Sequence, residues 1–503
     1  MRLPLVTPSG PPGPWTRPTR FDRNLIVIGG GAAGLVSAYI AAAVKAKVTL
    51  VEKGRMGGDC LNYGCVPSKA LIRAARAAED VRQAGAYGIG AGKPKVAFDK
   101  VMARVRDVIA RIEPHDSVER YEGLGVEVLQ GHARLVDPWT VEVTLKDGGT
   151  QRLTSRAIVL ATGAAPVIPP VRGIDNVHPL TSDSLWDAMD GRRHPPARLV
   201  VLGGGPIGCE LSQAFQRLGS QVTQVEMEHR LLVREDPEVS AHVETVLTRQ
   251  GVRVLTGSRA EGFGVEHGEK WIEVADAAGT RRIGFDEIVV ATGRAARTEG
   301  FGLEELGIAA GKVIETDAYL ETLHPSIFVA GDAAGPYQFT HAAAHQAWFA
   351  AVNALFGGLK RFRANYRALP AVTFTDPEVA RVGMTEAEAR DAAIGVDVTR
   401  YDLAELDRAI VDGAADGFVK VLTRRGGDRI VGATIVGPHA GELLAEFTLA
   451  MKHGIGLNKL LGTVHAYPTL AEANKYAAGA WRRANVNPTL LSLLERFHSW
   501  RRG

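Results

Sequence analysis

The chain has 503 residues, of which 46% are hydrophobic, and its formal net charge is +3. A charge this small gives no indication of a nucleic-acid partner, and the length suggests about three domains of roughly 150 residues each. Three cysteines are too few for the disulfide framework of a small secreted protein. Residues 1–20 carry six prolines and lack the apolar core of a signal peptide, so we expect a disordered tail and a cytoplasmic location.

The first predicted unit after this tail binds a dinucleotide. A short apolar strand leads into Gly29, Gly31 and Gly34, a helix-like stretch follows, and a second apolar strand ends in Glu52, 23 residues after Gly29. In such a unit the three glycines permit the tight turn, the approach of a pyrophosphate and the packing of helix on strand. The helix N-terminus offers free N–H groups to the phosphates, and the carboxylate accepts hydrogen bonds from ribose hydroxyls.

Two cysteines follow directly. Cys60 and Cys65 have four residues between them, and two thiols this close to a nucleotide-binding unit favour a redox pair over a structural disulfide. A helix is expected to start near Pro67, which places Lys69 one turn past Cys65, where its positive charge favours a thiolate. The alternative is a pair of buried free thiols. The third cysteine, Cys209, is expected to be a small core residue.

The nucleotide-binding pattern occurs a second time. Gly203, Gly205 and Gly208 follow another apolar strand, and Glu226 lies 23 residues after Gly203. One glycine pattern alone would be a weak signal, but two copies with strand, helix and acid at the same offset are a strong one. We therefore expect two dinucleotide sites.

Each half also ends in a similar way. Residues 157–163 and 287–294 are apolar strands that run into Ala-Thr-Gly, and a third such strand at residues 327–330 leads into Gly331-Asp332-Ala333. Turns at the carboxyl ends of parallel strands line the crevice in which nucleotides bind. The sequence predicts an α/β fold with two Rossmann-like units, the second inserted into the first.

With two glycine fingerprints, the Cys60–Cys65 pair and Gly331-Asp332, the sequence resembles the flavin-dependent pyridine nucleotide–disulfide oxidoreductases. That family includes dihydrolipoyl dehydrogenase, glutathione reductase and mercuric reductase, and the resemblance covers residues 22 to about 480. It implies an FAD domain, an inserted NAD(P) domain, an α+β C-terminal dimerisation domain and hence a homodimer. The expected division is a tail (1–20), the first segment of the FAD domain (21–164), the NAD(P) domain (165–294), the second segment of the FAD domain (295–368), the dimerisation domain (369–486) and a C-terminal helix (487–503).

The resemblance also implies which residues contact the cofactors FAD and NAD(P)H. The expected FAD contacts are Gly29, Gly31, Gly34, Glu52, Lys69, Ala133, Thr162, Gly163, Asp332, Thr340 and His341. The expected NAD(P) contacts are Gly203, Gly205, Gly208, Glu226 and Gly293. A carboxylate at Glu226 hydrogen-bonds a 2′-hydroxyl and repels a 2′-phosphate, which favours NADH. Arg230 lies nearby, so a relaxed preference stays open.

In the catalytic scheme that the resemblance implies, electrons pass from NAD(P)H through FAD to the Cys60–Cys65 disulfide. Cys65 is the flavin-proximal sulfur and Cys60 is the sulfur that exchanges with substrate. Lys69 pairs with Glu210 near the flavin, although an ordinary surface ion pair is the alternative interpretation.

The chain departs from its resemblance near the C-terminus. Dihydrolipoyl dehydrogenase and glutathione reductase have a histidine directly before Pro-Thr, oriented by a glutamate, which serves the partner subunit as acid–base. Here Glu472 is in place but Tyr467 precedes the proline, and His465 lies two residues early, or about 6.6 Å along an extended strand. Tyrosine at this position resembles mercuric reductase, where it serves the metal site. This chain nevertheless ends in Phe-His-Ser-Trp-Arg-Arg-Gly, without the C-terminal cysteine pair of that enzyme.

The leading prediction is a mercuric reductase-like homodimer that reduces a soft metal ion or a disulfide, with Cys60 and Cys65 as transient metal ligands. Dihydrolipoyl dehydrogenase is the first alternative, and a redox-sensing or partner-binding flavoprotein is the second. Residues 487–503 predict a basic amphipathic helix that begins with Asn487 as its cap and Pro488 in its first turn. This helix either packs on its own dimer or makes a weak peripheral contact with a membrane or a partner.

Overall fold

The computed structural model describes residues 15–503, so most of the tail expected at residues 1–20 lies outside the described residues. Trp15 is described, and its ring packs edge-on against the ring of His324 with 5.6 Å between the centroids. The chain divides into two compact units: the larger one extends to His229 and resumes at residues 247–364, and the smaller one contains residues 230–246 and 365–503.

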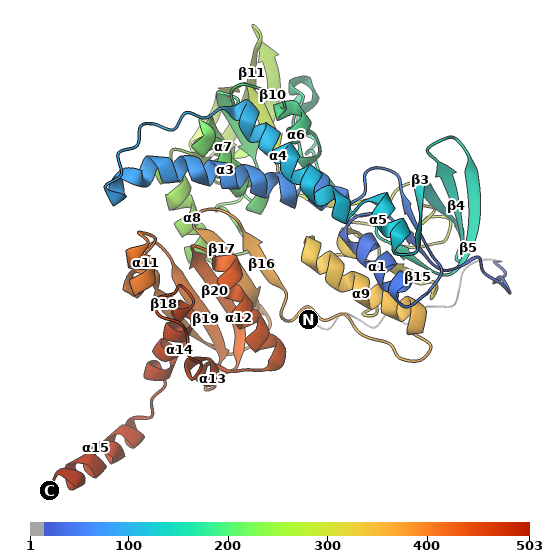
Figure 1. The fold of residues 1–503 in the computed structure, drawn as a ribbon. Helices are drawn as coiled ribbons and strands as arrows, with labels where there is room; N and C mark the ends of the chain where they lie inside the picture. The colour runs from blue at the N-terminus through green and yellow to red at the C-terminus, as the bar shows by residue number, and fades with distance from the viewer. Residues whose placement is uncertain (1–14) are drawn as a thin grey trace. The chain divides into compact units, whose positions relative to one another are not determined.

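The first sheet of the larger unit is mainly parallel (Figure 1). β1 lies between β2 and β5, β3 flanks β2, and β15 flanks β5, all in parallel, while β4 pairs antiparallel with the long ends of β3 and β5. The strands are β1 (Arg23–Ile28), β2 (Val48–Glu52), β3 (Val126–Asp137), β4 (Thr140–Leu145), β5 (Thr150–Leu160) and β15 (Ile327–Val329). Continuous apolar runs such as Leu25–Ile28 are buried on both faces, as parallel strands require.

Alternate residues of these strands enter two different cores. Leu25 and Val27 pack with the helices α1 (Ala32–Ala43) and α9 (Thr340–Phe356), which lie side by side in Figure 1. Ile26 and Ile28 pack on the opposite face, against apolar residues of the segment 301–314. Because successive side chains of a strand point to opposite faces, one face of the sheet is covered by helices and the other by an irregular layer.

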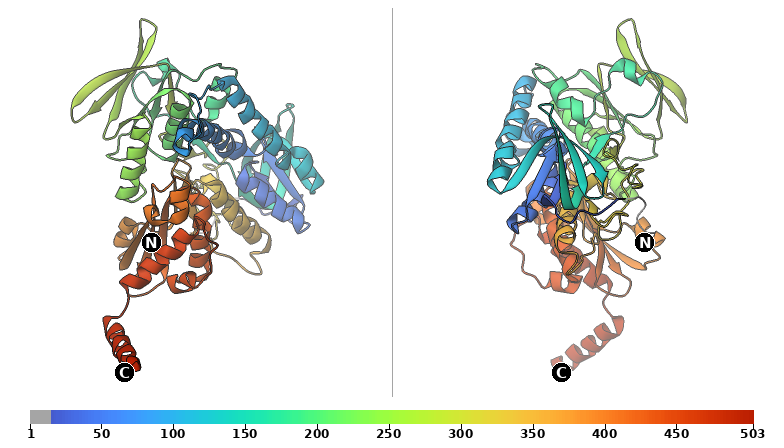
Figure 2. Two further views of the ribbon diagram at one scale, coloured as in Figure 1. Left: turned by 60° about the vertical axis from the view of Figure 1, so that its left-hand side comes forward. Right: turned by 90° about the vertical axis from the view of Figure 1, so that its right-hand side faces the viewer.

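The second parallel sheet has the strand order β13-β7-β8-β9. Its strands are β7 (Arg198–Leu202), β8 (Gln221–Val225), β9 (Arg253–Leu255) and β13 (Glu287–Val290), with helices α6 (Ser182–Met189) and α7 (Pro206–Leu218). Most residues of the helix α8 (Pro237–Arg249) belong to the smaller unit. An antiparallel ribbon follows, made of β10 (Arg259–Glu266), β11 (Glu269–Asp276) and β12 (Gly279–Phe285) (Figure 2). The chain enters and leaves this region through one short ladder, in which β6 (Ala164–Pro166) pairs with β14 (Arg294–Ala296).

The remaining helical elements of the larger unit lie between these strands. They are α2 (Gly58–Asn62), α3 (Cys65–Gln83), η1 (Ala84–Tyr87), α4 (Phe98–Ile112), η2 (Glu113–His115), α5 (Val118–Gly123), η3 (Ile174–Val177) and η4 (Gly331–Ala333). α3 packs on both α4 and α7, and the rings of Phe98 and Phe215 meet between α4 and α7 with 6.2 Å between their centroids.

The smaller unit contains a five-stranded antiparallel sheet in the order β16-β17-β20-β19-β18. Its strands are β16 (Pro370–Thr373), β17 (Glu378–Gly383), β18 (Val396–Asp402), β19 (Phe418–Arg424) and β20 (Ile430–Gly437). Its helical elements are α10 (Glu386–Asp391), η5 (Leu403–Glu405), α11 (Asp407–Val411), α12 (Ala440–His453), α13 (Leu457–Leu461), α14 (Glu472–Ala484) and α15 (Pro488–Arg502). Phe447 of α12 and Trp481 of α14 belong to the core that covers this sheet.

The predicted fold class, with two Rossmann-like units and an α+β C-terminal domain, is confirmed by this architecture. Among residues 15–503, no helix is both long enough and apolar enough to cross a membrane.

Candidate active site

The first glycine fingerprint is shaped by close backbone contacts. Gly29 has a φ of +109°, and a side chain there would overlap the carbonyl oxygen of Ala161, at the end of β5. A side chain at Gly34 would overlap the carbonyl oxygen of Gly29. Around a Cβ atom built at Gly31, by contrast, only the Cα of Gly58 lies within 4 Å, at 3.7 Å. The N-terminus of α1 therefore faces a space that a phosphate group can enter.

The second fingerprint repeats this geometry. Gly203 has a φ of +121°, and a side chain there would overlap the carbonyl oxygen of Ala291, at the end of β13. A side chain at Gly208 would overlap the carbonyl oxygen of Gly203, whereas nothing lies within 4 Å of a side chain built at Gly205. Neither α1 nor α7 has a side-chain cap, so the backbone N–H groups of both first turns are directed toward the phosphate positions.

The acid at the end of each second strand reaches its fingerprint loop. Glu52 accepts hydrogen bonds from the backbone N–H of Gly30, at 2.5 Å, and of Gly54, at 2.6 Å. Glu226 accepts the matching bond from the N–H of Gly204. Both carboxylates thus lie beside a helix N-terminus, in the position that suits ribose hydroxyls. These residues fit two bound dinucleotides.

Asp332 follows β15, at the carboxyl edge of the first sheet. Burial raises the pKa of its carboxyl group to about 6, although the charge of Arg294 acts in the opposite direction. Within the described chain no residue donates a hydrogen bond to this carboxylate, while its neighbour Gly331 is held by the side chain of Gln346 at 2.7 Å. An acceptor with free lone pairs at this edge fits the hydroxyl chain of FAD.

Most of the other expected cofactor residues also lie at strand ends. Thr162 and Gly163 follow β5, and the Thr162 hydroxyl donates to the carbonyl of Arg297 at 2.8 Å. Gly293 follows β13 with a φ of +137° and open space beside it. Ala133 is buried inside β3.

The two cysteines occupy adjoining helices. Cys60 lies in α2, and Cys65 is the first residue of α3, so α3 begins two residues before the expected start near Pro67. The physical reason is that proline is tolerated throughout a first helical turn, where its missing N–H has no intrahelical partner. Both thiols are free, and the sulfur of Cys65 lies 3.4 Å from the hydroxyl of Thr340 on α9. The neighbouring His341 is exposed, with its ring stacked on Phe339.

The two thiols have very different acidities. The hydrogen bond from Cys60 lowers the pKa of Cys65 to about 6, assisted by the Thr340 hydroxyl and the charge of Lys69 and opposed by desolvation. The same hydrogen bond, together with burial, raises the pKa of Cys60. Because the hydrogen bond couples the two sulfurs, the first proton to leave the pair comes from Cys65 and the remaining one stays on Cys60.

Lys69 and Glu210 form an ion pair between α3 and α7. Their Nζ and Oε2 atoms are 2.8 Å apart, and the Glu210 side chain is only 6% exposed. A glutamate this well buried distinguishes the pair from an ordinary surface salt bridge. The pair joins the helix of the reacting cysteine to the helix of the second fingerprint.

Two further contacts hold the segment 59–63, which leads into Cys65. The indole N–H of Trp186 donates to the carbonyl of Tyr63 at 2.7 Å, and Arg294 pairs with Asp59 at 3.1 Å. Burial raises the pKa of Asp59 despite this partner. Neither contact was predicted from the sequence. Arg294 could have been suspected because it directly follows the second Ala-Thr-Gly turn, whereas nothing in the sequence singles out Trp186.

Near the C-terminus, Tyr467 is 69% exposed and donates a hydrogen bond from its hydroxyl to Asp407 at 3.1 Å. This bond raises the pKa of Tyr467. Glu472 is buried and accepts hydrogen bonds from the N–H of Thr469, at 3.2 Å, and from the hydroxyl of Tyr476, at 3.4 Å. Glu472 therefore braces its own loop and helix rather than an imidazole.

His465 is occupied on both sides of its ring. Nδ1 lies 3.1 Å from the carbonyl oxygen of Thr463, and Nε2 lies 2.9 Å from a carboxylate oxygen of Glu446. A neutral imidazole carries one N–H, and the tautomer decides which of the two ring nitrogens donates. Each ring nitrogen of His465 thus lies within contact distance of an oxygen atom of the same chain.

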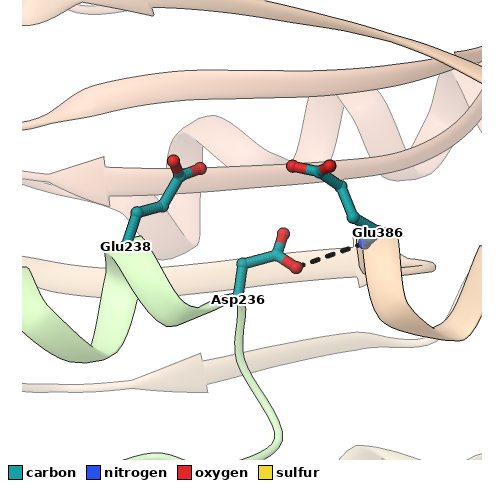
Figure 3. Close-up of side chains that lie close together, drawn as sticks. All are labelled: Asp236, Glu238 and Glu386. Carbon is teal, nitrogen blue, oxygen red and sulfur yellow. Dashed lines mark hydrogen bonds between the residues drawn. The ribbon is translucent and has the colours of Figure 1, made fainter.

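One group of carboxylates in the described residues has the spacing of a metal site (Figure 3). Asp236, Glu238 and Glu386 all belong to the smaller unit, and the backbone N–H of Glu386 also donates to Asp236 at 3.2 Å. Nζ of the buried Lys420 lies 2.9, 2.8 and 2.5 Å from the three carboxylates. Burial alone would disfavour the ammonium, but hydrogen bonds to all three carboxylates raise the pKa of Lys420. The ammonium takes the place of a metal ion, and the cluster is structural.

Comparison with known proteins follows the same division of the chain. Residues 23–347 match the family described as pyridine nucleotide-disulphide oxidoreductase, and residues 369–478 match the dimerisation domain of that family. Mercuric reductase from Streptomyces lividans is 34% identical over 463 residues, which cover 90% of this chain and 95% of that protein. Dihydrolipoyl dehydrogenase from Thermus scotoductus is 36% identical over 471 residues, which cover 92% and 98%.

Solved structures show the same similarity. LpdA from Mycobacterium tuberculosis has a TM-score of 0.83 and 28% identity, and the match covers 91% of this chain and 99% of LpdA. The HOCl-induced flavoprotein disulfide reductase RclA from Escherichia coli has a TM-score of 0.79 and 25% identity, again with 91% and 99% covered.

The pKa of Cys65 can be tested by titration. In the dithiol enzyme we expect thiolate absorbance in the ultraviolet to rise with pH with a midpoint near 6, because a group with a lowered pKa is deprotonated above that pH. Lys69→Met and Cys60→Ala should each move the midpoint upward, since each removes a group that lowers the pKa. Cys209→Ser is the control, because burial raises the pKa of Cys209 to about 12 and this thiol is silent near neutrality. If neither Lys69→Met nor Cys60→Ala moves the midpoint, the assignment of the thiolate to Cys65 is contradicted.

Proposed function

The chain belongs to the pyridine nucleotide-disulphide oxidoreductase family, and we propose that it uses NAD(P)H to reduce a soft metal ion through Cys60 and Cys65. It is an NAD(P)H-dependent flavoprotein disulfide oxidoreductase, and its relatives include mercuric reductases and dihydrolipoyl dehydrogenases. For mercuric ion the reaction is NAD(P)H + Hg²⁺ → NAD(P)⁺ + H⁺ + Hg⁰, which balances in charge and in electrons. We further propose a cytoplasmic location, where reduced nicotinamide nucleotides are available.

The cofactor roles follow from the two fingerprints. FAD, when bound, supplies the chemistry that connects a two-electron hydride donor to a disulfide. Gly31 and Glu52 hold its phosphate and ribose ends, and Asp332 accepts hydrogen bonds from its hydroxyl chain. Gly205 and Glu226 do the same work for NAD(P)H.

The cysteine pair suits a soft dication. Sulfur is the ligand that such ions prefer, and two thiolates satisfy linear coordination. Cys65 is already the thiolate, held by Thr340 and Lys69, so only Cys60 has to lose a proton when the ion binds. By resemblance to the family, Cys60 would be the sulfur that exchanges with the acceptor, and Cys65 would be the sulfur on the flavin side.

The observation that carries this proposal is that Tyr467 and His465, the side chains near Pro468 that could exchange a proton, already have hydrogen-bond partners in their own chain. A dithiol substrate needs an acid–base of suitable pKa at the partner's cysteines. Tyr467 has a raised pKa and points its hydroxyl at Asp407, and His465 has both ring nitrogens engaged. A metal ion needs no proton transfer of this kind. Metal reduction is therefore favoured over dihydrolipoamide oxidation, which is the second candidate.

We propose that the chain forms a homodimer and that Tyr467 and Glu472 lie at its interface. The family's dimerisation domain covers residues 369–478 of the chain. Large apolar side chains of this domain are well exposed in the single chain, among them Val411 at 70%, Leu449 at 58% and Val464 at 91%. A second copy of the chain provides the apolar surface that such residues require.

NADH is the proposed nucleotide. Arg230 follows Glu226 in the sequence and could have favoured NADPH. It donates to the carbonyls of Val233 and Glu235 at 2.8 and 2.7 Å, and to the hydroxyl of Ser240 at 2.9 Å. These three bonds hold the guanidinium within the segment 230–240, which disfavours its use for a 2′-phosphate. The carboxylate of Glu226 therefore decides the preference.

The acceptor can be identified by steady-state NADH oxidation with mercuric ion, cupric ion, lipoamide, oxidised glutathione and quinones. We expect mercuric ion to be the best acceptor, with Cys60→Ser and Cys65→Ser each lowering its turnover by at least about a hundredfold. Cys209→Ser should retain turnover, because Cys209 is buried and its sulfur only donates to the carbonyl of Gly204 and accepts from the side chain of Gln224. Faster turnover with lipoamide than with every metal ion would reject the proposal.

Tyr467→His tests the missing acid–base. We expect dihydrolipoamide activity to rise by about tenfold or more, because an imidazole contributes general acid–base catalysis of that order. Tyr467→Phe is the matched control, since it removes the hydroxyl without supplying an imidazole. If both variants respond alike, the identity of this residue does not set the substrate class.

Glu226→Ala tests the nucleotide preference. Loss of the carboxylate should raise the KM for NADH by about tenfold, through the lost ribose hydrogen bonds, and leave the KM for NADPH equal or lower. Glu228→Ala removes the same charge two residues later and serves as the control, because its side chain is exposed. Equal losses for the two nucleotides with Glu226→Ala would exclude the ribose role.

A further inference from the structure

The C-terminal helix α15 lies outside the region of the chain that its family shares. The match to the dimerisation domain ends at residue 478, and α15 occupies Pro488–Arg502. The match to LpdA covers 99% of that protein but only 91% of this one, which leaves some of this chain without a counterpart. The electron-transfer chemistry of the family therefore does not account for α15.

All 15 residues of α15 are exposed. Its side chains contact one another: Phe497 and Trp500 lie with 6.2 Å between their ring centroids, and Arg501 lies over the Phe497 ring. Asn487 caps the helix by accepting a hydrogen bond from the N–H of Thr489 at 2.9 Å. Figure 1 shows α15 as a separate rod that follows a short connection after α14. The helix is thus well terminated but is not packed on the described residues of its own chain.

The apolar residues of α15 form one broad face. At about 100° per residue they cover roughly half of the helix circumference, and the small polar residues Ser492 and Ser499 lie on the opposite side. The exposed apolar side chains, at 42–77% exposure, are Leu490, Leu491, Leu493, Leu494, Phe497 and Trp500. An apolar face of this width that is exposed in the single chain indicates that another surface covers it.

The charges of α15 indicate the chemistry of that surface. The helix carries three arginines, Arg496, Arg501 and Arg502, against a single acid, Glu495. Arg483, exposed near the end of α14, adds a further positive charge just before the helix. Arginine side chains form paired hydrogen bonds with phosphate groups, and their positive charge is attracted to an anionic surface.

We propose that α15 is an interfacial anchor that holds the enzyme on an anionic lipid membrane. Its apolar face enters the boundary between headgroups and acyl chains, and its arginines contact the lipid phosphates. The helix is about 22 Å long, shorter than a hydrocarbon core of about 30 Å, so it lies in the plane of the membrane and does not cross it. This inference does not depend on which acceptor the cysteine pair reduces.

A second copy of the chain is the competing occupant. Some apolar positions of α15 follow a heptad seam, but the helix provides only about two heptads, whereas a stable coiled coil needs three or four. Leu491 and Leu494 also widen the apolar face beyond the narrow seam that a coiled coil buries. Arg496 and Arg502 border this broad face, and Arg501 lies at its C-terminal end over the Phe497 ring. Such a face suits a lipid surface better than a partner helix.

The test is co-sedimentation of the FAD-loaded, full-length enzyme with vesicles. We expect binding to vesicles of phosphatidylglycerol and phosphatidylcholine, weaker binding at high salt, and much weaker binding to phosphatidylcholine alone. Removal of residues 488–503 should lower the partition onto anionic vesicles by at least about tenfold, because the anchor is lost. NADH oxidation should be unchanged by this deletion, which shows that the enzyme remains folded.

Two matched substitutions separate insertion from simple charge attraction. Phe497→Glu and Ser499→Glu add the same charge, but the first lies on the apolar face and the second on the polar face. We expect Phe497→Glu to reduce binding by about tenfold or more and Ser499→Glu by less than about threefold. Equal effects of the two substitutions, or unchanged binding after the deletion, would overturn the proposal. If vesicles do not bind and the deletion instead weakens the homodimer in sedimentation, a second copy covers α15 and the membrane role is rejected.

Discussion

Both nucleotide sites depend on the same steric constraint, the close approach of a glycine to a carbonyl oxygen at the end of the neighbouring parallel strand. Gly29 meets the carbonyl of Ala161 in this way, and Gly203 meets that of Ala291. Any side chain at these glycines would push the loop away from the sheet. Because the loop, the helix start and the adjoining Ala-Thr-Gly turn are fixed together, the N-termini of α1 and α7 are both left open to phosphate.

The segment that carries Cys60 and Cys65 is held to the two nucleotide-binding units by contacts on both of its sides. Cys65 begins α3, where free N–H groups, the Thr340 hydroxyl and Lys69 all favour the thiolate. The loop before it is held by elements of the second nucleotide-binding region, through the Trp186 indole and the Arg294 guanidinium. The segment that carries the two sulfurs is thereby held by side chains of α6, β14 and α9.

Proton chemistry distinguishes the candidate acceptors. A disulfide or dithiol substrate takes up or releases protons at sulfur, so it needs an imidazole or an equivalent group beside it. A soft cation is bound and reduced through sulfur alone, and its binding only displaces the Cys60 proton. In the described chain, Tyr467 and His465 near Pro468 are hydrogen-bonded to residues of the same chain. That arrangement fits a soft cation better than a disulfide or dithiol substrate. The exposed helix α15 adds a question of location that is separate from this chemistry.

The amino-acid sequence by itself determined the features that repeat or lie close along the chain: the two fingerprints with their acids, the cysteine pair, the helical offset of Lys69, and the cap of α15. These depend on local geometry and period, which a sequence displays directly. Only the tertiary structure decided contacts across long separations, because these depend on how helices and sheets pack. The indole of Trp186 donates to the carbonyl of Tyr63 across 123 positions in the chain, and the ammonium of Lys420 fills a carboxylate cluster that would otherwise resemble a metal site. Nε2 of His465 likewise lies beside the carboxylate of Glu446.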